Sequence, residues 1–243
     1  MKIVVTDLTR FNNADIVCLA GIDPESGECI RPMRDNNGRL EYFAFDAIKK
    51  SKVIPGSILE GDFRPCENIE PPHTEDHRAI GKVSVVGNAT GVEFEQILSE
   101  SAYESIVDGF QSNPAGRLFR QDQYPENSII TLALRDPAHQ FKLTVSSDFG
   151  KTTFKAHIID GAGLRVEWVP VTDLGFFVHL NDIVANDPDL EKLNNFLWTQ
   201  KTLFLRIGLG RPWGMSPEKF GCWLQLNGVY SFPNFRRDIR VYE

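Results

Sequence analysis

The sequence predicts a mainly β protein with short helical insertions, arranged as two tandem small β-barrels. Two observations predict this class. Short runs of β-branched and aromatic residues, bounded by Gly, Pro, Asn and Asp, recur along the whole chain. These runs fall into two sets of about five short strands, each with one helical insertion, and small barrels accommodate such sets better than one sandwich does.

The strands expected in the first set are residues 2–6, 15–21, 29–32, 57–63 and 80–86. Those expected in the second set are residues 129–134, 141–146, 153–159, 165–171, 203–209, 222–227 and 239–242. A break at residues 148–151 is typical of a hairpin turn between two of them. Two short, similar segments, residues 5–11 and 171–177, are compatible with an internal duplication.

Three segments have helical character. Residues 45–50 fit one or two helical turns, and residues 92–110 place apolar side chains at helical spacing, which predicts one or two short helices. Asp187 followed by Pro188 is typical of an N-cap and first helical residue, so we expect a helix from there to about Trp198. The polar loop 113–123 is the expected boundary between domains 1–124, a barrel with a helical extension, and 125–243, a second barrel.

Composition limits the function classes. The chain has 243 residues, 42% of them hydrophobic, which is enough for a substantial core. A net charge of −7 disfavours a protein that coats duplex DNA, but it leaves room for a small site for one strand. No apolar run reaches the roughly 20 residues of a membrane span, and we expect a cytoplasmic protein that does not enter the membrane. The four cysteines show no C-x-x-C spacing, so we expect neither a zinc nor a dithiol site, and no cofactor.

The best candidates for ligand contact gather late in the chain. Arginines on a Gly- and Pro-rich loop can hold a phosphate, and a nearby indole can stack on a base. Strand alternation places Trp223, Gln225 and Asn227 on one face and two leucines on the other. The competing interpretation is that Trp223 packs in the core, the amides satisfy backbone groups, and the arginines pair with acids. The late candidates are Arg206, Arg211, Trp213, Trp223, Gln225, Asn227 and Tyr230.

The N-terminal region adds one further candidate. Arg31 precedes Pro32 at the end of an expected strand, where it can contact a ligand or form an ion pair. Asp7 and Thr9 are expected to close a turn through side-chain to backbone hydrogen bonds.

The segment from His73 to His77 is where metal-type ligands crowd together. His73, Glu75, Asp76 and His77 could hold a divalent metal if the segment were helical. Pro71 and Pro72 favour an extended entry instead, which would set the two histidines about 13 Å apart. We therefore expect a polar connector and no metal, with a metal-dependent phosphoester hydrolase as the alternative function.

Several patches together resemble one family. They are residues 4–11 (VVTDLTRF), 20–23 (AGID), 30–32 (IRP), 72–77 (PHTEDH), 206–213 (RIGLGRPW) and 222–233 (CWLQLNGVYSFP). With these patches the chain resembles the dual OB-domain family of prokaryotic proteins over nearly its full length. The resemblance implies two tandem OB-like barrels and, by analogy, a nucleic-acid or nucleotide role. It assigns no catalytic residue.

The sequence thus favours a binding protein over an enzyme. Its expected ligand is single-stranded nucleic acid or a nucleotide, held by arginines and read by tryptophan and amide side chains. A protein-interaction adaptor, favoured by the acidic net charge, remains a second alternative beside the hydrolase.

Overall fold

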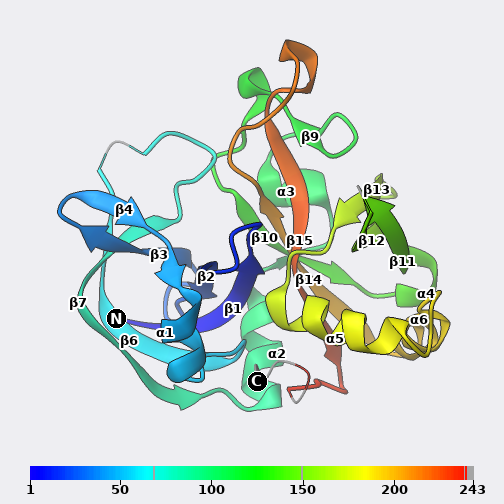
Figure 1. Cartoon of the computed structure of the whole chain (residues 1–243), viewed down its shortest axis with the longest axis horizontal. Helices are drawn as coiled ribbons and strands as arrows, with labels where there is room; N and C mark the ends of the chain where they lie inside the picture. The colour runs from blue at the N-terminus through cyan, green and yellow to red at the C-terminus, as the bar shows by residue number, and fades with distance from the viewer. Residues whose placement is uncertain (68, 149, 238, 240–243) are drawn as a thin grey trace.

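The computed structural model describes residues 1–67, 69–148, 150–237 and 239 (Figure 1). Strands dominate the chain, its helices are short, and its sheets are strongly curled. The prediction of a mainly β chain with short helical insertions is therefore confirmed. Within these described ranges, no helix is long and apolar enough to cross a membrane.

Five strands of the first half are β1 (Lys2–Arg10), β2 (Ile16–Ile22), β3 (Cys29–Asn36), β6 (Ser57–Pro65) and β7 (Asp76–Asn88). They pair as a closed circuit, in the order β1, β2, β3, β7, β6 and back to β1. Only the pairing between β3 and β7 is parallel. We call this closed set the first ring. The short strands β4 (Arg39–Glu41) and β5 (Phe43–Ala44) and helix α1 (Phe45–Lys50) connect β3 to β6.

A β-bulge in β1 decides which side chains leave the first ring. The register of β1 against β2 shifts between Val5 and Asp7. Before the shift Ile3 and Val5 point into the ring core, and after it Leu8 does. Because one inserted residue moves the alternation to the other face, Asp7 and Thr9 point outward. Both are buried all the same, because the second half of the chain covers them.

Six strands of the second half are β10 (Ile129–Leu134), β11 (Phe141–Asp148), β12 (Lys151–Ile159), β13 (Arg165–Pro170), β14 (Thr202–Leu209) and β15 (Cys222–Phe232). β10 pairs with β14 and β14 with β15, while β11 pairs with β12 and β12 with β13. A parallel bridge between Val171 and Leu226 joins the end of β13 to β15. One turn of helix, α4 (Pro137–Gln140), leads β10 into β11 along the chain, while β10, β14 and β15 remain in one hydrogen-bonded sheet and β11, β12 and β13 in another. We call these strands the second ring.

Short elements cover the rings. In the chain, four of them lie between β7 and β10: α2 (Gly91–Glu100), β8 (Ala102–Tyr103), α3 (Ile106–Phe110) and β9 (Leu118–Phe119). β8 pairs with β10 and β9 pairs with β15, so this connecting segment extends the sheet of the second ring. Helices α5 (Leu174–Val184) and α6 (Glu191–Trp198) lie between β13 and β14 and pack beside the second ring (Figure 1).

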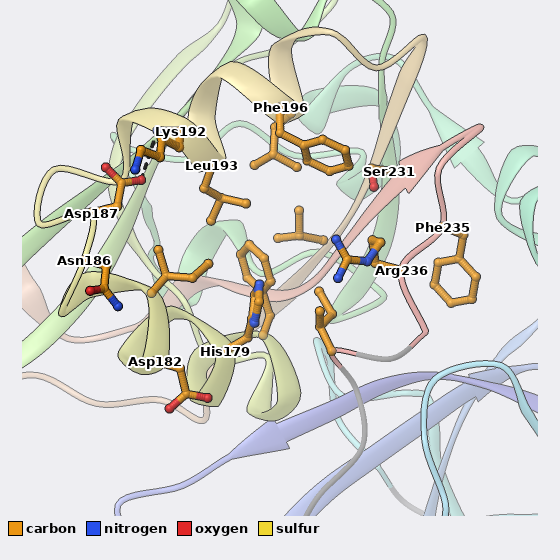
Figure 2. A pocket seen from close by; sticks show the side chains of 15 residues that line it. His179, Asp182, Asn186, Asp187, Lys192, Leu193, Phe196, Ser231, Phe235 and Arg236 are labelled. Carbon is orange, nitrogen blue, oxygen red and sulfur yellow. Dashed lines mark hydrogen bonds between the residues drawn. The ribbon is translucent and has the colours of Figure 1, made fainter.

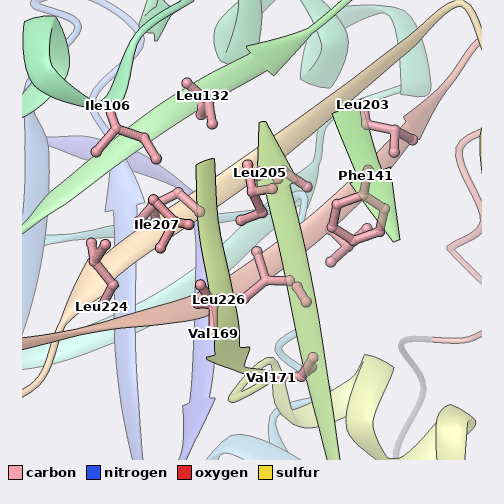
Figure 3. Packing of buried hydrophobic residues seen from close by; sticks show 14 of the residues in the cluster. Ile106, Leu132, Phe141, Val169, Val171, Leu203, Leu205, Ile207, Leu224 and Leu226 are labelled. Atoms are coloured by element: carbon pink, nitrogen blue, oxygen red, sulfur yellow. The ribbon is translucent and has the colours of Figure 1, made fainter. Parts of the chain in front are cut away.

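The largest apolar core fills the second ring. Side chains from facing strands interdigitate there, among them Leu132, Phe141, Val169, Leu205 and Leu226 (Figure 3). A separate cluster joins the two halves and includes Val4 of β1, Phe94 of α2 and Phe204 of β14. Tyr230 belongs to it and donates its hydroxyl hydrogen to the carbonyl of Thr6 at 2.6 Å. Shared apolar burial therefore holds the two rings in one arrangement.

Most predicted elements are found, and the differences have local causes. The expected strands, α1, and the helices within 92–110 are present, whereas the strand expected at 239–242 lies outside the described residues apart from Ile239. The helix after Asp187 begins only at Glu191, because Leu190 adopts a left-handed conformation that buries its side chain. Asp187 still caps it, accepting hydrogen bonds from the backbone N–H groups of Glu191 and Lys192.

The two similar segments do not occupy equivalent elements. Residues 5–11 lie mainly in β1, whereas residues 171–177 run from the end of β13 into α5, a helix that the strand prediction missed. The segments instead touch each other, since Arg10 donates its backbone hydrogen to the carbonyl of Thr172 at 2.9 Å. Their similarity therefore does not mark a structural repeat.

Candidate nucleic-acid interface

The predicted ligand-binding residues separate into buried and accessible groups. Arg31 and Arg206 are almost fully buried where the two halves meet. Arg211 and Trp213 are exposed on the loop between β14 and β15, which projects from the second ring (Figure 1). On β15 itself, Trp223 and Gln225 are half-buried and Asn227 is buried.

Arg206 is a bridge between the two rings. It lies in the middle of β14 with only 1% of its surface exposed. Its Nε donates to Oδ2 of Asp7 at 2.8 Å, its Nη1 to Oγ1 of Thr131 at 2.7 Å, and its Nη2 to Sγ of Cys29 at 3.1 Å. The sequence predicts that Asp7 closes a turn. Its carboxylate instead compensates the buried charge of Arg206 from the other half. Arg206 also forms part of the wall of a cleft of about 680 Å³ between the halves, whose lining is polar and apolar in equal parts.

Arg31 belongs to a second buried network. Its Nε donates to the carboxylate of Asp76, and its Nη1 donates to Oγ of Ser128 at 3.2 Å. The other oxygen of Asp76 accepts a hydrogen bond from Nη2 of Arg211 at 2.7 Å. Burial raises the pKa of Asp76, but Arg31 and Arg211 outweigh burial and hold this pKa below its usual range. One carboxylate thus joins an arginine from each half.

Glu75 fastens the start of β10 to the same network. Its carboxylate accepts hydrogen bonds from the backbone N–H groups of Ser128 and Ile129 and from the Ser128 hydroxyl. Burial raises the pKa of Glu75 despite the nearby Arg31 charge. Ion pairing with acids is the competing interpretation of the arginines that the sequence allows. Arg31 and Arg206 do pair with acids, and their side chains do not face solvent.

His73 lies beside these charges with 5% of its surface exposed. Among the described residues, neither of its ring nitrogens has a hydrogen-bond partner. Burial, and then the positive charges of Arg211 and Arg31, lower the pKa of His73 to about 3. The imidazole is therefore neutral in the folded protein at physiological pH.

We expect His73 to make the protein less stable as the pH falls. The unfolded chain protonates His73 near pH 6.5, whereas the folded chain does so only near pH 3, so acid favours unfolding between these values. The loss at pH 5 should be about 2 kcal/mol. Urea unfolding at neutral pH and at pH 5 should show a smaller loss for His73→Phe than for the wild type. An equal loss would contradict a buried neutral His73, and His139→Phe, at a largely exposed histidine, serves as the control.

The side chains of the His73 to His77 segment are not arranged as a metal site. Asp76 and Glu75 are engaged by arginines and backbone N–H groups, and Nδ1 of His77 lies 2.9 Å from the carbonyl of Glu75. In the part of the chain that the structure describes, no group of three or more His, Cys, Asp or Glu side chains is placed to hold a metal ion.

A different surface carries exposed aromatic side chains, and it begins at Trp168. The pairing of β12 with β13 shifts between Ala156 and Ile158, which leaves an extra residue in β13. Trp168 adopts a φ of 61° there, a left-handed conformation that costs a bulky residue roughly 1–2 kcal/mol. As a result its indole points outward, 50% exposed, with its ring 4.8 Å from that of His157.

Arg117 connects this tryptophan to β15. Its Nη1 donates to the carbonyl of Trp168, and its guanidinium lies 5.3 Å from the ring centroid of Trp223. The position of Arg117 is fixed because the next residue, Leu118, pairs with Trp223 between β9 and β15. A guanidinium carries five N–H donors, so it can hold a carbonyl and an indole and still face an anion.

Trp213 extends the surface along the projecting loop. Its backbone pairs with Gly221 at the base of the loop, and its carbonyl accepts a hydrogen bond from Nε1 of Trp223 at 3.1 Å. The loop needs glycine at 214, where a Cβ would lie 2.2 Å from the Lys219 carbonyl oxygen. The Trp213 side chain is 60% exposed. We call the continuous set His157, Trp168, Arg117, Trp223 and Trp213 the aromatic track.

The two amides on β15 lie beside this track at different depths. Gln225 is half-buried on the same face as Trp223, while Leu224 and Leu226 point into the core, as strand alternation predicts. Asn227 is 6% exposed and accepts a hydrogen bond from the Thr172 hydroxyl at 3.0 Å. Gln225 is thus partly accessible on the surface of β15, and Asn227 ties β15 to the end of β13.

Trp168 and Arg117 were missed by the sequence analysis. A tryptophan within a strand is usually a core residue, and only the bulge, which pairing with β12 creates, turns Trp168 outward. Arg117 lies in a polar loop whose pairing with β15 is not encoded locally. A weak signal exists: Trp168 and Val169 are consecutive apolar residues, which breaks the alternation of β13.

A separate, largely apolar cavity of about 550 Å³ lies between α5, α6 and β15 (Figure 2). His179, Lys192 and Arg236 are among the polar side chains around it, and Leu193 and Phe196 are among the apolar ones. It shares no residue with the aromatic track or with the buried networks. None of the residues predicted to bind a ligand lines it.

No protein-family model matches the chain, and no curated protein is significantly similar to it.

Proposed function

We propose that the chain binds single-stranded nucleic acid on the aromatic track, without catalysis. The observation that carries the proposal is Trp168, whose backbone is held in a costly conformation that exposes the indole. Strained residues of this kind concentrate at functional sites. Exposed indoles at Trp168 and Trp213 are stacking platforms for bases, and Arg117 between them supplies a charge for the phosphate backbone.

We also propose that both rings are OB-like barrels. In each ring the strands can be numbered one to five in chain order. Strand one then lies beside strand two, two beside three, three beside five, five beside four, and four beside one again, and a helix lies in the connection between strands three and four. In the second ring, position one is split into β10 and β11. OB-folds bind oligonucleotides on strands two and three and on the loops after strands one and four. Three residues of the track lie on the corresponding elements: His157 on β12, Trp168 on β13 and Trp213 on the loop between β14 and β15. Arg117 precedes β9 and Trp223 lies on β15.

The net charge of −7 is compatible with this function, because binding relies on contacts at short range. Basic residues border the track: Arg120 is exposed on the neighbouring loop, and Lys142 and Arg165 are exposed on β11 and β13. The same loop region carries exposed Met215 and Phe220, which are also compatible with a protein partner. A protein partner is therefore the outcome that the binding test must exclude.

Fluorescence anisotropy of labelled single-stranded RNA and DNA tests the proposal. Replacing Trp213 by alanine should weaken binding about tenfold, since stacking of one base contributes roughly 1–3 kcal/mol. Tyr103→Ala is the matched control, because Tyr103 is an exposed aromatic residue on β8 outside the track. An equal effect of both substitutions, or absence of binding to any single strand at low salt, would argue against the site.

A further inference from the structure

The aromatic track does not end on the second ring. Arg211 lies two residues before Trp213, and its side chain reaches the first half of the chain. Its Nε donates to the hydroxyl oxygen of Tyr42 at 3.2 Å, while its Nη2 forms the ion pair with Asp76. The Arg211 side chain is nevertheless 45% exposed, so it presents a cation at the surface where the two halves meet.

Tyr42 continues this surface onto the first ring. It lies between β4 and β5, and its ring centroid is 4.6 Å from that of Phe11, which follows β1. The side chains of Phe11 and Tyr42 are both half-buried, so part of each is packed and part is accessible. We call Phe11 and Tyr42 the first-half aromatic pair. It comes from the loops that flank β2 and β3 of the first ring.

A series of contacts therefore connects aromatic and cationic groups from one half to the other. Trp168 contacts Arg117, Arg117 contacts Trp223, and Trp223 contacts Trp213. Arg211 then joins Trp213 through the chain and Tyr42 through a hydrogen bond. The buried ion pair of Arg206 with Asp7 and the partly exposed ion pair of Arg211 with Asp76 keep the halves at a fixed spacing, so this path does not depend on an induced closure.

We propose that one nucleic-acid strand crosses from the second half to the first over Arg211 and stacks on the first-half aromatic pair. This inference rests on the proposed function and narrows its substrate. A mononucleotide can occupy only one stacking position, whereas an oligomer can occupy both halves and gains from their linkage. The ligand is thus an extended single strand that is longer than the site of one barrel. The site of one OB-type barrel covers about 4–16 nucleotides.

A length series tests the crossing. Fluorescein-labelled oligothymidylates from about 4 to about 20 nucleotides would be titrated against the full chain. Wild-type affinity should rise with length and then level off. Tyr42→Ala should lower affinity about tenfold for the longest oligomers and leave the shortest unchanged, while Tyr42→Phe, which keeps the ring, should retain most of the affinity. Trp213→Ala should weaken binding at every length.

Each other result overturns a definite part of the account. If Tyr42→Ala has no effect at any length while Trp213→Ala still weakens binding, the strand stays on the second half and only the crossing fails. If Tyr42→Ala weakens short and long oligomers equally, Tyr42 acts through the Arg211 loop and the crossing is again wrong. If the wild type binds no oligomer, the proposed function fails together with the crossing.

Discussion

Replacing Asp76 by alanine should destabilise the protein by about 3–5 kcal/mol. Asp76 is 4% exposed and accepts hydrogen bonds from Arg31 and Arg211, one arginine from each half. Without it, the buried guanidinium of Arg31 keeps the 4.0 Å contact with Glu75 as its nearest ion pair. Because a buried charge that loses its partner keeps its full desolvation cost, the penalty should be large. Urea unfolding monitored by tryptophan fluorescence measures it.

Two comparisons separate this effect from a general sensitivity to mutation. Asp62→Ala removes an exposed carboxylate that pairs with Arg64, and it should leave stability nearly unchanged, because solvent screens an exposed ion pair. A double variant, Arg31→Met with Asp76→Leu, removes both buried charges and should recover much of the stability lost in Asp76→Ala. A loss below about 1 kcal/mol in Asp76→Ala would mean that the network does not fix the two halves.

Replacing Arg117 by alanine should have the largest effect on strand binding of any single substitution in the track. Arg117 contacts both Trp168 and Trp223, so its loss removes a phosphate contact and also the support of two indoles. We expect affinity to fall at least about thirtyfold, the sum of a charged contact and weakened stacking. Anisotropy titrations at low salt measure it.

The matched control for this substitution is Arg64→Ala, which removes an exposed arginine on β6 far along the chain. Arg117→Lys adds a second comparison, because lysine keeps the charge but cannot form the planar fork of contacts. Its affinity should fall between those of the wild type and Arg117→Ala. Equal affinity of Arg117→Ala and Arg64→Ala would remove Arg117 from the interface.

Local pattern was sufficient to predict most strands. In β10 and β14, apolar residues fill most of the strand, and turn residues bound it. Helix α5 was missed because residues 165–171 form a strand and the helix follows almost at once, with Asp173 as its N-cap. The start of α6 was wrong because burial of Leu190, a tertiary effect, overrides the preference for Pro188 at the first helical position.

The site was predicted in part, for reasons that can be traced to single residues. Trp213 lies on a loop set by Gly210, Pro212 and Gly214, which sequence shows directly. Arg206 and Arg31 carry no local sign of their partners, since Asp7 is 199 residues from Arg206 and Asp76 is 45 from Arg31. The outward turn of Trp168 depends on a bulge that pairing alone creates. Long-range pairing thus decided which arginines are buried.

The salt dependence of single-strand binding is the most direct test of the central claim. Phosphate contacts release counterions, so affinity for a single strand should fall linearly on logarithmic axes, by about 0.7 in slope for each phosphate contacted. We predict a steep slope for the wild type and for Arg64→Ala, and a slope shallower by about 0.7 for Arg117→Ala. Absence of binding at low salt, or identical slopes for all three proteins, would contradict phosphate recognition by the aromatic track.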